Sequence, residues 1–206
     1  MQFLCNLFSQ SQCILLNTNK RAPLDQSSDK NIMFQVRDGD IDQLQHLFHR
    51  HHARLYNFFV GMTNNRVASQ DLTQEVFLRI LRFRHTFKGN GSFASWMFRI
   101  ARNVGMDYFR KSKQADPLYD VENELVSDDL DPLEESTKSQ EMKILRAALQ
   151  RISVHHREVL IMNRFEHLKV REIAKILNCP VNTIKVRIHR AIKELGAVYQ
   201  EISGVL

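Results

Sequence analysis

The chain has 206 residues, enough for one ordinary domain or two small ones, and its 29 basic and 23 acidic residues give a formal net charge of +6. This positive charge favours a polyanionic partner, while seven glycines and four prolines provide too few turns for a many-stranded β fold. The three cysteines, Cys5, Cys13 and Cys179, form neither a CxxC pair nor an even-numbered framework, which argues against a zinc site and a secreted disulfide scaffold.

Residues 1–32 show no clear periodicity. Apolar residues such as Leu4, Leu7 and Ile14 are interrupted by polar ones, and no basic residue precedes them. The segment is therefore a poor signal peptide and too short for a membrane span. We predict that residues 1–32 are a dispensable extension, or an artefact of an upstream start, with Met33 directly after it.

The first domain is predicted to contain a helix that follows a chain break at Asp38-Gly39-Asp40, with Asp40 as its N-cap. Apolar residues at helical spacing form the predicted core of the first domain: Ile41, Leu44, Phe48, Leu55, Phe58, Phe59 and Met62. The sequence from Thr63 to Asn65 should end this helix, and the next helix should begin shortly after Val67.

The stretch from Asp71 to Lys111 contains two helical patterns joined by a glycine-bearing loop. The first pattern has a predicted buried face formed by Leu72, Val76, Ile80 and Phe83. The opposite stripe is polar with one leucine in it, and consists of Asp71, Gln74, Glu75, Leu78 and Arg82. Such a stripe suits a partner surface as well as it suits water.

The second pattern follows the loop from Lys88 to Ser92, with Ser92 placed as an N-cap. Its predicted buried stripe is Phe93, Met97, Ile100, Val104 and Tyr108. The outward side chains combine cations and amides with aromatic neighbours: Arg99, Arg102, Asn103, Asp107, Arg110 and Lys111, flanked by Phe93, Trp96 and Phe109. Phosphates need cations and unstacked bases need flat partners, so this surface suits opened single-stranded nucleic acid. A solvated face on a core helix is the alternative.

The stretch from Asp116 to Glu141 is strongly acidic. It holds ten of the 23 acidic residues against the single Lys138, and the rest of the chain, with 28 basic and 13 acidic residues, carries +15. With Pro117, Pro132 and few large apolar residues, this composition predicts a flexible linker, assigned to residues 113–136. The linker is either a soluble tether or a negatively charged mimic of nucleic acid.

A second helical domain is predicted over residues 137–206, and within it Lys169 to Leu195 has the layout of a helix-turn-helix. Cys179 is predicted to be a packing residue in the turn. The second helix should turn Ile184, Ile188, Ala191 and Leu195 inward. The opposite face is then Lys185, Val186, His189 and Arg190, which can enter a major groove together, with Arg187 and Thr183 as contacts to the DNA backbone.

The sequence DLTQEVF from Asp71, F-x-x-W from Phe93 and IARN-x-x-x-D-x-x-RK from Ile100 resemble a module of the extracytoplasmic-function sigma factors of the sigma-70 family. The similarity extends, with one gap, from about Val36 to about Tyr199. It implies an all-α protein with two small helical domains joined by an acidic flexible linker, the second a helix-turn-helix domain. Residues 33–112 would bind core RNA polymerase and melt the minus-ten element, and residues 137–206 would recognise the minus-thirty-five element.

The resemblance also implies roles for individual residues. Asp71, Gln74, Glu75 and Leu78 would bind the clamp helices of the largest polymerase subunit. Minus-ten DNA would be contacted by Lys88, Asn90, Ser92, Trp96, Arg99, Asn103, Asp107 and Arg110, with a flipped base captured by the loop. Minus-thirty-five DNA would be contacted by Thr183, Lys185, Val186, Arg187, His189 and Arg190. Val186 replaces a commonly polar residue and Asn182 a frequent glycine, so the promoter preference of relatives does not transfer.

The predicted partners are core RNA polymerase, promoter DNA and an anti-sigma factor, in the cytoplasm, without a cofactor, a metal or membrane insertion. The alternative is a helix-turn-helix regulator whose first domain senses a ligand or dimerises. Catalysis is disfavoured because no His, Lys or metal set accompanies Asp71 and Glu75. His49, His51 and His52 lack the spacing of a structural metal site, so we predict solvated helix surface there.

Overall fold

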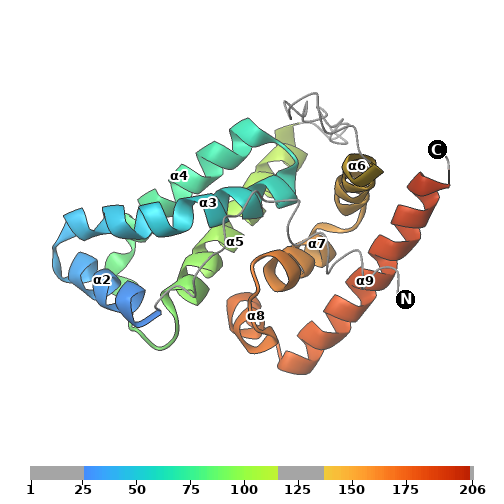
Figure 1. Ribbon diagram of the computed structural model, residues 1–206. Helices are drawn as coiled ribbons and strands as arrows, with labels where there is room; N and C mark the ends of the chain where they lie inside the picture. The colour runs from blue at the N-terminus through green and yellow to red at the C-terminus, as the bar shows by residue number, and fades with distance from the viewer. Residues whose placement is uncertain (1–25, 116–136, 205–206) are drawn as a thin grey trace.

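The computed structural model describes residues 26–115 and 137–204, which form helices and short turns (Figure 1). The first domain contains α2 (Gln26–Asp38), η1 (Ile41–Gln43), α3 (Leu44–Thr63), α4 (Arg66–Arg82), η2 (Arg84–Thr86) and α5 (Phe93–Ala115). The second contains α6 (Thr137–Arg151), α7 (Val154–Leu160), η3 (Ile161–Phe165), α8 (Val170–Leu177) and α9 (Val181–Ser203). The predicted all-α class with two helical domains is confirmed. Most of the predicted linker lies outside the described residues.

The core of the first domain lies between α3, α4 and α5. Phe58 of α3 packs edge-on against Phe98 of α5, with ring centroids 5.5 Å apart, and both side chains are buried. Val76 and Ile80 of α4 are also fully buried. Because these residues repeat at threes and fours, each helix buries one face and leaves the other to solvent or a partner.

Two asparagines set the junction between α3 and α4. Asn64 ends α3 in the left-handed conformation, with φ of 52°, which asparagine adopts more readily than most residues. Asn65 then caps α4, its side-chain oxygen accepting the Ala68 backbone N–H at 2.9 Å. This cap starts α4 at Arg66, slightly before the predicted position.

Other sequence predictions are wrong. Ile41 and Phe48, predicted as core, are 44% and 39% exposed. Asp40 stands at the N-cap position of the 3-10 turn η1 rather than of α3, and its side chain makes no capping hydrogen bond to the backbone. Its carboxylate instead accepts the side-chain amide of Gln43 at 3.1 Å. Phe83 is not part of the buried face of α4 but is 42% exposed. The reason is that α4 ends at Arg82, so Phe83 no longer follows the helical repeat.

Helix α2 crosses the predicted domain boundary at Met33, since it begins at Gln26. Asp29 is buried and accepts hydrogen bonds from Arg50 and from His51 Nε2, each at 2.7 Å. His51 is buried as well, so its prediction as solvated helix surface is wrong. Burial alone would raise the pKa of the Asp29 carboxyl, but the hydrogen bonds from His51 and Arg50 outweigh burial and hold the pKa below its ordinary value of 3.8.

In the second domain, α9 packs against α6, α7 and α8. Its predicted inward face is confirmed: Ile184, Ile188, Ala191 and Leu195 are buried. Asn178 ends α8 in the left-handed conformation, with φ of 50°, and Pro180 stands at the N-cap position of α9. This short turn produces the helix-turn-helix predicted from the sequence. No described helix has an apolar stretch long enough to cross a membrane.

Buried Arg157 joins the two domains. Its guanidinium donates to the Met62 carbonyl at the end of α3 and to the Gln150 and Ile152 carbonyls at the end of α6. The last carbonyls of a helix lack intrahelical partners and carry partial negative charge, so a cation is favourable there. Burial lowers the pKa of Arg157 to about 10, and the side chain stays charged at neutral pH. Figure 1 shows the resulting arrangement, with α7 and α8 beside the first domain.

We predict that Asp29→Asn lowers the free energy of unfolding by about 2 kcal/mol at pH 7, because a buried charged hydrogen-bond acceptor is lost. The native pKa of Asp29 lies below its unfolded value, so this contribution is present at neutral pH and is lost as the pH falls through the native pKa. Urea titrations of the wild type and of Asp29→Asn, from pH 7 to pH 3, would measure how far their free energies of unfolding converge. Asp38→Asn, which breaks an exposed pair with Arg37, is the matched control and should have little effect. The prediction is wrong if the difference in the free energy of unfolding between the two proteins is the same at every pH. It is also wrong if Asp29→Asn is as stable as the wild type at pH 7.

Candidate nucleic-acid interface

The polar stripe of α4 lies on the surface. Asp71 and Gln74 are exposed, and Leu78 between polar neighbours is 62% exposed. Val67, at 69% exposure, lies four residues before Asp71 and extends the same stripe. The sequence pattern missed Val67 because the helix was expected to begin after it. An apolar residue at either end of a polar stripe suits a protein partner better than it suits water.

Glu75 lies at the edge of this stripe and belongs to an ion-pair network. It pairs with Arg79 at 2.6 Å, and Arg79 reaches Asp107 of α5 at 3.1 Å. Burial alone would lower the pKa of the Arg79 guanidinium, but hydrogen bonds to Glu75 and Asp107 raise it. Asp107 also pairs with Arg110 at 3.0 Å. The two arginines neutralise the Asp107 carboxylate, which reduces its repulsion of a nearby phosphate.

The loop from Lys88 to Ser92 rests on α2. Gly89 has φ of 69°, and a Cβ there would lie 2.4 Å from the Phe34 ring and 2.8 Å from the Lys30 side chain. Only glycine fits both constraints. Lys88 and Asn90 are exposed on the loop. Ser92 is half-buried, and its hydroxyl accepts the Ser95 backbone N–H at 3.2 Å, as expected for the predicted N-cap.

Helix α5 brings the predicted minus-ten residues into one line. Trp96, Arg99, Asn103, Asp107 and Arg110 recur at spacings of three and four along one continuous helix, so they share a face. Arg99, Asn103 and Arg110 are exposed, whereas Trp96 is half-buried against Phe87, with ring centroids 5.3 Å apart. The face therefore offers cations and an amide beside a fixed aromatic ring.

The opposite side of α9 from its buried face carries the predicted minus-thirty-five residues. Thr183, Lys185, His189 and Arg190 are exposed, and Val186 is 50% exposed. Asn182 and Lys193 are exposed on the same face, and helical spacing places both close to the line through Val186 and His189. Neither was predicted as a DNA contact from the sequence, although the same periodicity could have placed both on this face.

Arg187 differs from the other candidates on α9. It is half-buried, and its charge acts on the buried carboxyl of Glu158 in α7. Arg187 thus faces the body of the protein at least in part, whereas Arg190 projects into solvent.

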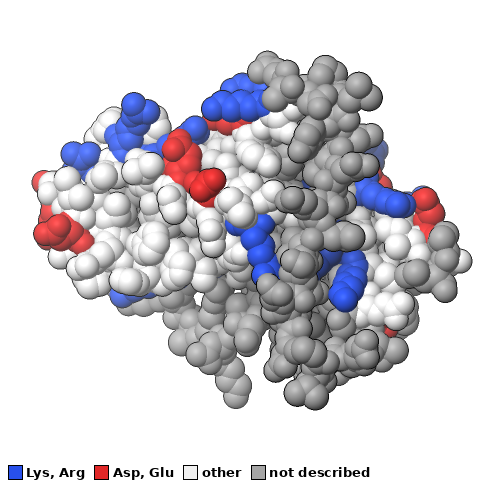
Figure 2. Space-filling view, turned by 90° about the horizontal axis from the view of Figure 1, so that it is seen from above, with Lys and Arg blue, Asp and Glu red and all other residues white. Residues whose placement is uncertain are grey.

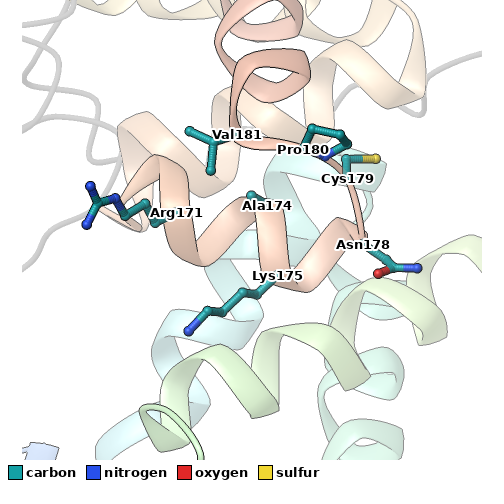
Figure 3. Close-up of a pocket in the computed structure, with 7 residues that line it drawn as sticks. All are labelled: Arg171, Ala174, Lys175, Asn178, Cys179, Pro180 and Val181. Carbon is teal, nitrogen blue, oxygen red and sulfur yellow. The ribbon is translucent and has the colours of Figure 1, made fainter.

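The turn of the helix-turn-helix contains an open groove. It is lined by Arg171, Ala174, Lys175, Asn178, Cys179, Pro180 and Val181. Figure 3 shows Arg171 and Lys175 extending from α8, with Cys179 beside Pro180 in the turn. Cys179 is half-buried against the core and donates its thiol to the Leu177 carbonyl at 3.3 Å, in agreement with the predicted packing role.

Charges on the surface are mixed. Figure 2 shows basic side chains in several separate groups, with acidic ones beside them, rather than one continuous basic patch on the face in view. Among residues 26–115 and 137–204, no group of three or more His, Cys, Asp or Glu side chains is placed to hold a metal ion. The geometry is that of a helix-turn-helix DNA-binding protein with a second helical domain that bears cations beside aromatic rings.

Comparisons with known proteins identify the family. Residues 47–115 match the model of sigma-70 region 2, and residues 142–195 match that of sigma-70 region 4. The extracytoplasmic-function RNA polymerase sigma factor SigX of Bacillus subtilis is 31% identical over 159 residues, which cover 75% of this chain and 82% of SigX. This chain belongs to the extracytoplasmic-function sigma factors of the sigma-70 family, and is a transcription initiation factor that directs RNA polymerase to promoters.

Two solved structures share the fold. CnrH, solved in complex with the cytosolic domain of CnrY, matches with a TM-score of 0.65 and 20% identity, over 84% of this chain and 97% of CnrH. The sigma factor RpoE of Bartonella quintana, solved with the anti-sigma factor NepR, matches with a TM-score of 0.63 and 21% identity, over 76% of this chain and 96% of RpoE. At these identities the likeness concerns the fold.

We predict that Gly89→Ala destabilises the first domain by about 1 to 3 kcal/mol, because it adds a left-handed penalty and a clash with Phe34. Gly91→Ala is the matched control in the same loop, since a Cβ there meets no atom within 4 Å. Thermal unfolding followed by circular dichroism would compare the two variants. Equal unfolding temperatures would show that α2 does not constrain the loop.

Proposed function

We propose that the two domains divide promoter recognition between them. The α4 stripe binds core RNA polymerase, the loop from Lys88 to Ser92 and the exposed face of α5 bind the melted minus-ten element, and α9 reads the minus-thirty-five element as duplex. The observation that carries this proposal is the line of Trp96, Arg99 and Asn103 directly after the glycine loop, on the helix that also pairs with α4.

The α5 face fits an opened strand better than a duplex. A flipped base costs a few kcal/mol of unpairing, which contacts made only with the open strand must offset. Arg99 and Arg110 offer cations for phosphates, Asn103 offers an amide to base edges, and half-buried Trp96 offers an aromatic ring beside them. The neutralised Asp107 carboxylate can accept a hydrogen bond from a base amine without strongly repelling the backbone.

The α9 face fits a major groove. Arg190 can donate two hydrogen bonds to a guanine, Lys185 can reach guanine or phosphate, and Val186 offers only methyl groups, which suit a thymine methyl. Thr183 and Arg187 are proposed as backbone contacts. Asn182 and Lys193 are added to these proposed DNA contacts because they are exposed on the same face of α9.

The partners proposed for this chain are core RNA polymerase, promoter DNA and an anti-sigma factor, in the cytoplasm. Support for an anti-sigma factor comes from the RpoE structure of Bartonella quintana, which contains NepR. The chain acts by binding rather than by catalysis. The alternative function, a helix-turn-helix regulator whose first domain senses a ligand or dimerises, is disfavoured because residues 47–115 of the first domain match sigma-70 region 2.

We predict that Asp71→Ala with Glu75→Ala abolishes binding to bacterial core polymerase, and with it promoter-specific transcription in vitro from a promoter library. Glu75 also holds Arg79, so Leu78→Ala, which breaks no hydrogen bond, is a second variant that should weaken binding in the same direction. Gln45→Ala, exposed on α3, is the matched control. Wild-type affinity of both α4 variants for core polymerase would refute the proposed surface.

We predict that Arg190→Ala costs about 1 to 3 kcal/mol at one base position and relaxes the preference there. Arg187→Ala should instead weaken all promoters alike and reduce the salt dependence by about one unit, because it removes a phosphate contact. Promoter selection with each variant, at two salt concentrations, separates the two effects. An unchanged preference at every position in Arg190→Ala would mean that α9 reads DNA through other residues.

A further inference from the structure

Helix α2 lies beside the chain that leads through the loop from Lys88 to Ser92 into α5 (Figure 1). Both neighbours of this loop are buried, since Phe87 before it is 2% exposed and Phe93 after it is 1% exposed. Asn90 in the middle of the loop is exposed. The loop is thus a short exposed segment between two buried aromatic anchors, Phe87 and Phe93, and side chains of α2 hold both anchors.

Phe34 of α2 contacts the first anchor and the loop itself. The ring centroids of Phe34 and Phe87 are 5.4 Å apart. The Phe34 ring also lies so close to Gly89 that an added Cβ there would clash with it. Two cations hold the ring from α2, with the Arg37 guanidinium 4.7 Å and the Lys30 ammonium 5.8 Å from its centroid. A half-buried ring held in this way offers the loop a fixed surface.

The second anchor is held by α2 through His51. Asp29 accepts a hydrogen bond from His51 Nε2 at 2.7 Å, and the His51 ring centroid is 5.2 Å from that of Phe93. All three side chains are buried. This contact does not involve Phe34, so α2 fixes the end of the loop independently of its start and middle.

The loop itself has little intrinsic rigidity. Two of its five residues are Gly89 and Gly91, and glycine has more backbone freedom than any other residue. Ordering the backbone of one residue changes an affinity by about tenfold. Base recognition needs its hydrogen-bonding groups within about 0.5 Å of their productive positions. A loop of this composition therefore needs outside support to discriminate between bases, and α2 is placed to supply it.

We propose that Phe34 is a positioning residue for base selection, whose ring holds the loop in the one conformation that discriminates between bases of the minus-ten element. The inference rests on the proposed capture of a flipped base by this loop. Phe34 acts through Gly89 and Phe87 rather than by contact with DNA. Two further residues of α2, Asp29 and Lys30, thereby contribute to promoter recognition, although the sequence analysis assigned them to a dispensable extension.

The test uses full-length variants with bacterial core polymerase and a promoter library randomised at both elements. Phe34→Leu keeps an apolar side chain but removes the ring from Gly89. We expect preference at one or more minus-ten positions to fall about tenfold, the effect of one disordered residue. Phe34→Met, which fills more of the same space, should give a smaller loss in the same direction. Preference at the minus-thirty-five element and affinity for core polymerase should equal those of the wild type.

Ile32→Ala is the matched control on the same helix. Ile32 is half-buried against the core, and its position two residues before Phe34 places it on the other side of α2. This variant should lower the unfolding temperature without changing any base preference. The comparison separates a positioning role of Phe34 from a general loss of stability in α2.

Trp96, the single tryptophan of the chain, reports on the loop directly. Its ring centroid is 5.3 Å from that of Phe87, which in turn contacts Phe34. In Phe34→Leu we expect acrylamide to quench Trp96 fluorescence more strongly than in the wild type, because Phe87 loses the ring that supports it. In Ile32→Ala the quenching constant should stay at the wild-type value.

Lys88→Ala with Asn90→Ala separates this inference from the proposed function. If this loop variant loses minus-ten preference and Phe34→Leu keeps it, Phe34 is not a positioning residue, whereas the proposed function stands. If the loop variant keeps the wild-type preference, the loop does not select a base and both are wrong. An equal loss of preference in Ile32→Ala and Phe34→Leu would overturn the inference as well, as would unchanged quenching of Trp96 in Phe34→Leu.

Discussion

The arrangement of the two domains depends on one buried cation. Arg157 donates to carbonyls at the C-terminal ends of both α3 and α6, so a single guanidinium completes two helix ends that belong to different domains. The Gln150 side chain adds a hydrogen bond to the Gly61 carbonyl at 3.1 Å. Burying a charge is costly unless it is hydrogen-bonded, and here the carbonyls compensate it. Because α9 packs on α6 and α7, these contacts also set where α9 stands relative to the first domain.

The proposed functional surfaces lie on helices that bury one face in the core and expose the opposite face. In α4 the buried residues Val76 and Ile80 fix the rotation of the helix, and that rotation alone brings Asp71 and Leu78 to the surface. The same reasoning holds for α9, where buried Ile184 and Ile188 leave Val186 and His189 in solvent. Packing in the core therefore determines which side chains can meet polymerase or DNA.

The contacts between the domains have unequal strengths. Glu166 is buried together with Arg54, so losing either partner leaves an uncompensated charge. Glu158 is buried but its partner Arg102 is half-buried, and the hydrogen bonds of Glu172 to Ser92 and Ser95 are partly exposed and weak. Burial raises the pKa of Glu158, and Arg102 opposes this increase. Gly61 adds a steric limit, because a Cβ there would lie 3.0 Å from the Ile161 side chain.

The sequence by itself determined the all-α class, the inward face of α9 and the family. Local periodicity identified the buried residues of α9, and Ser92 was recognisable as a cap, because both depend on residues within a few positions of one another. Only the tertiary structure decided that Asp29 binds His51, that Asp107 is neutralised by Arg79, and that Glu172 reaches Ser95. These partners are 22, 28 and 77 positions apart in the chain, so no local pattern relates them. They meet because the helices pack at fixed angles, and that packing also determines which predicted DNA-binding residues are exposed and which are held by the second domain.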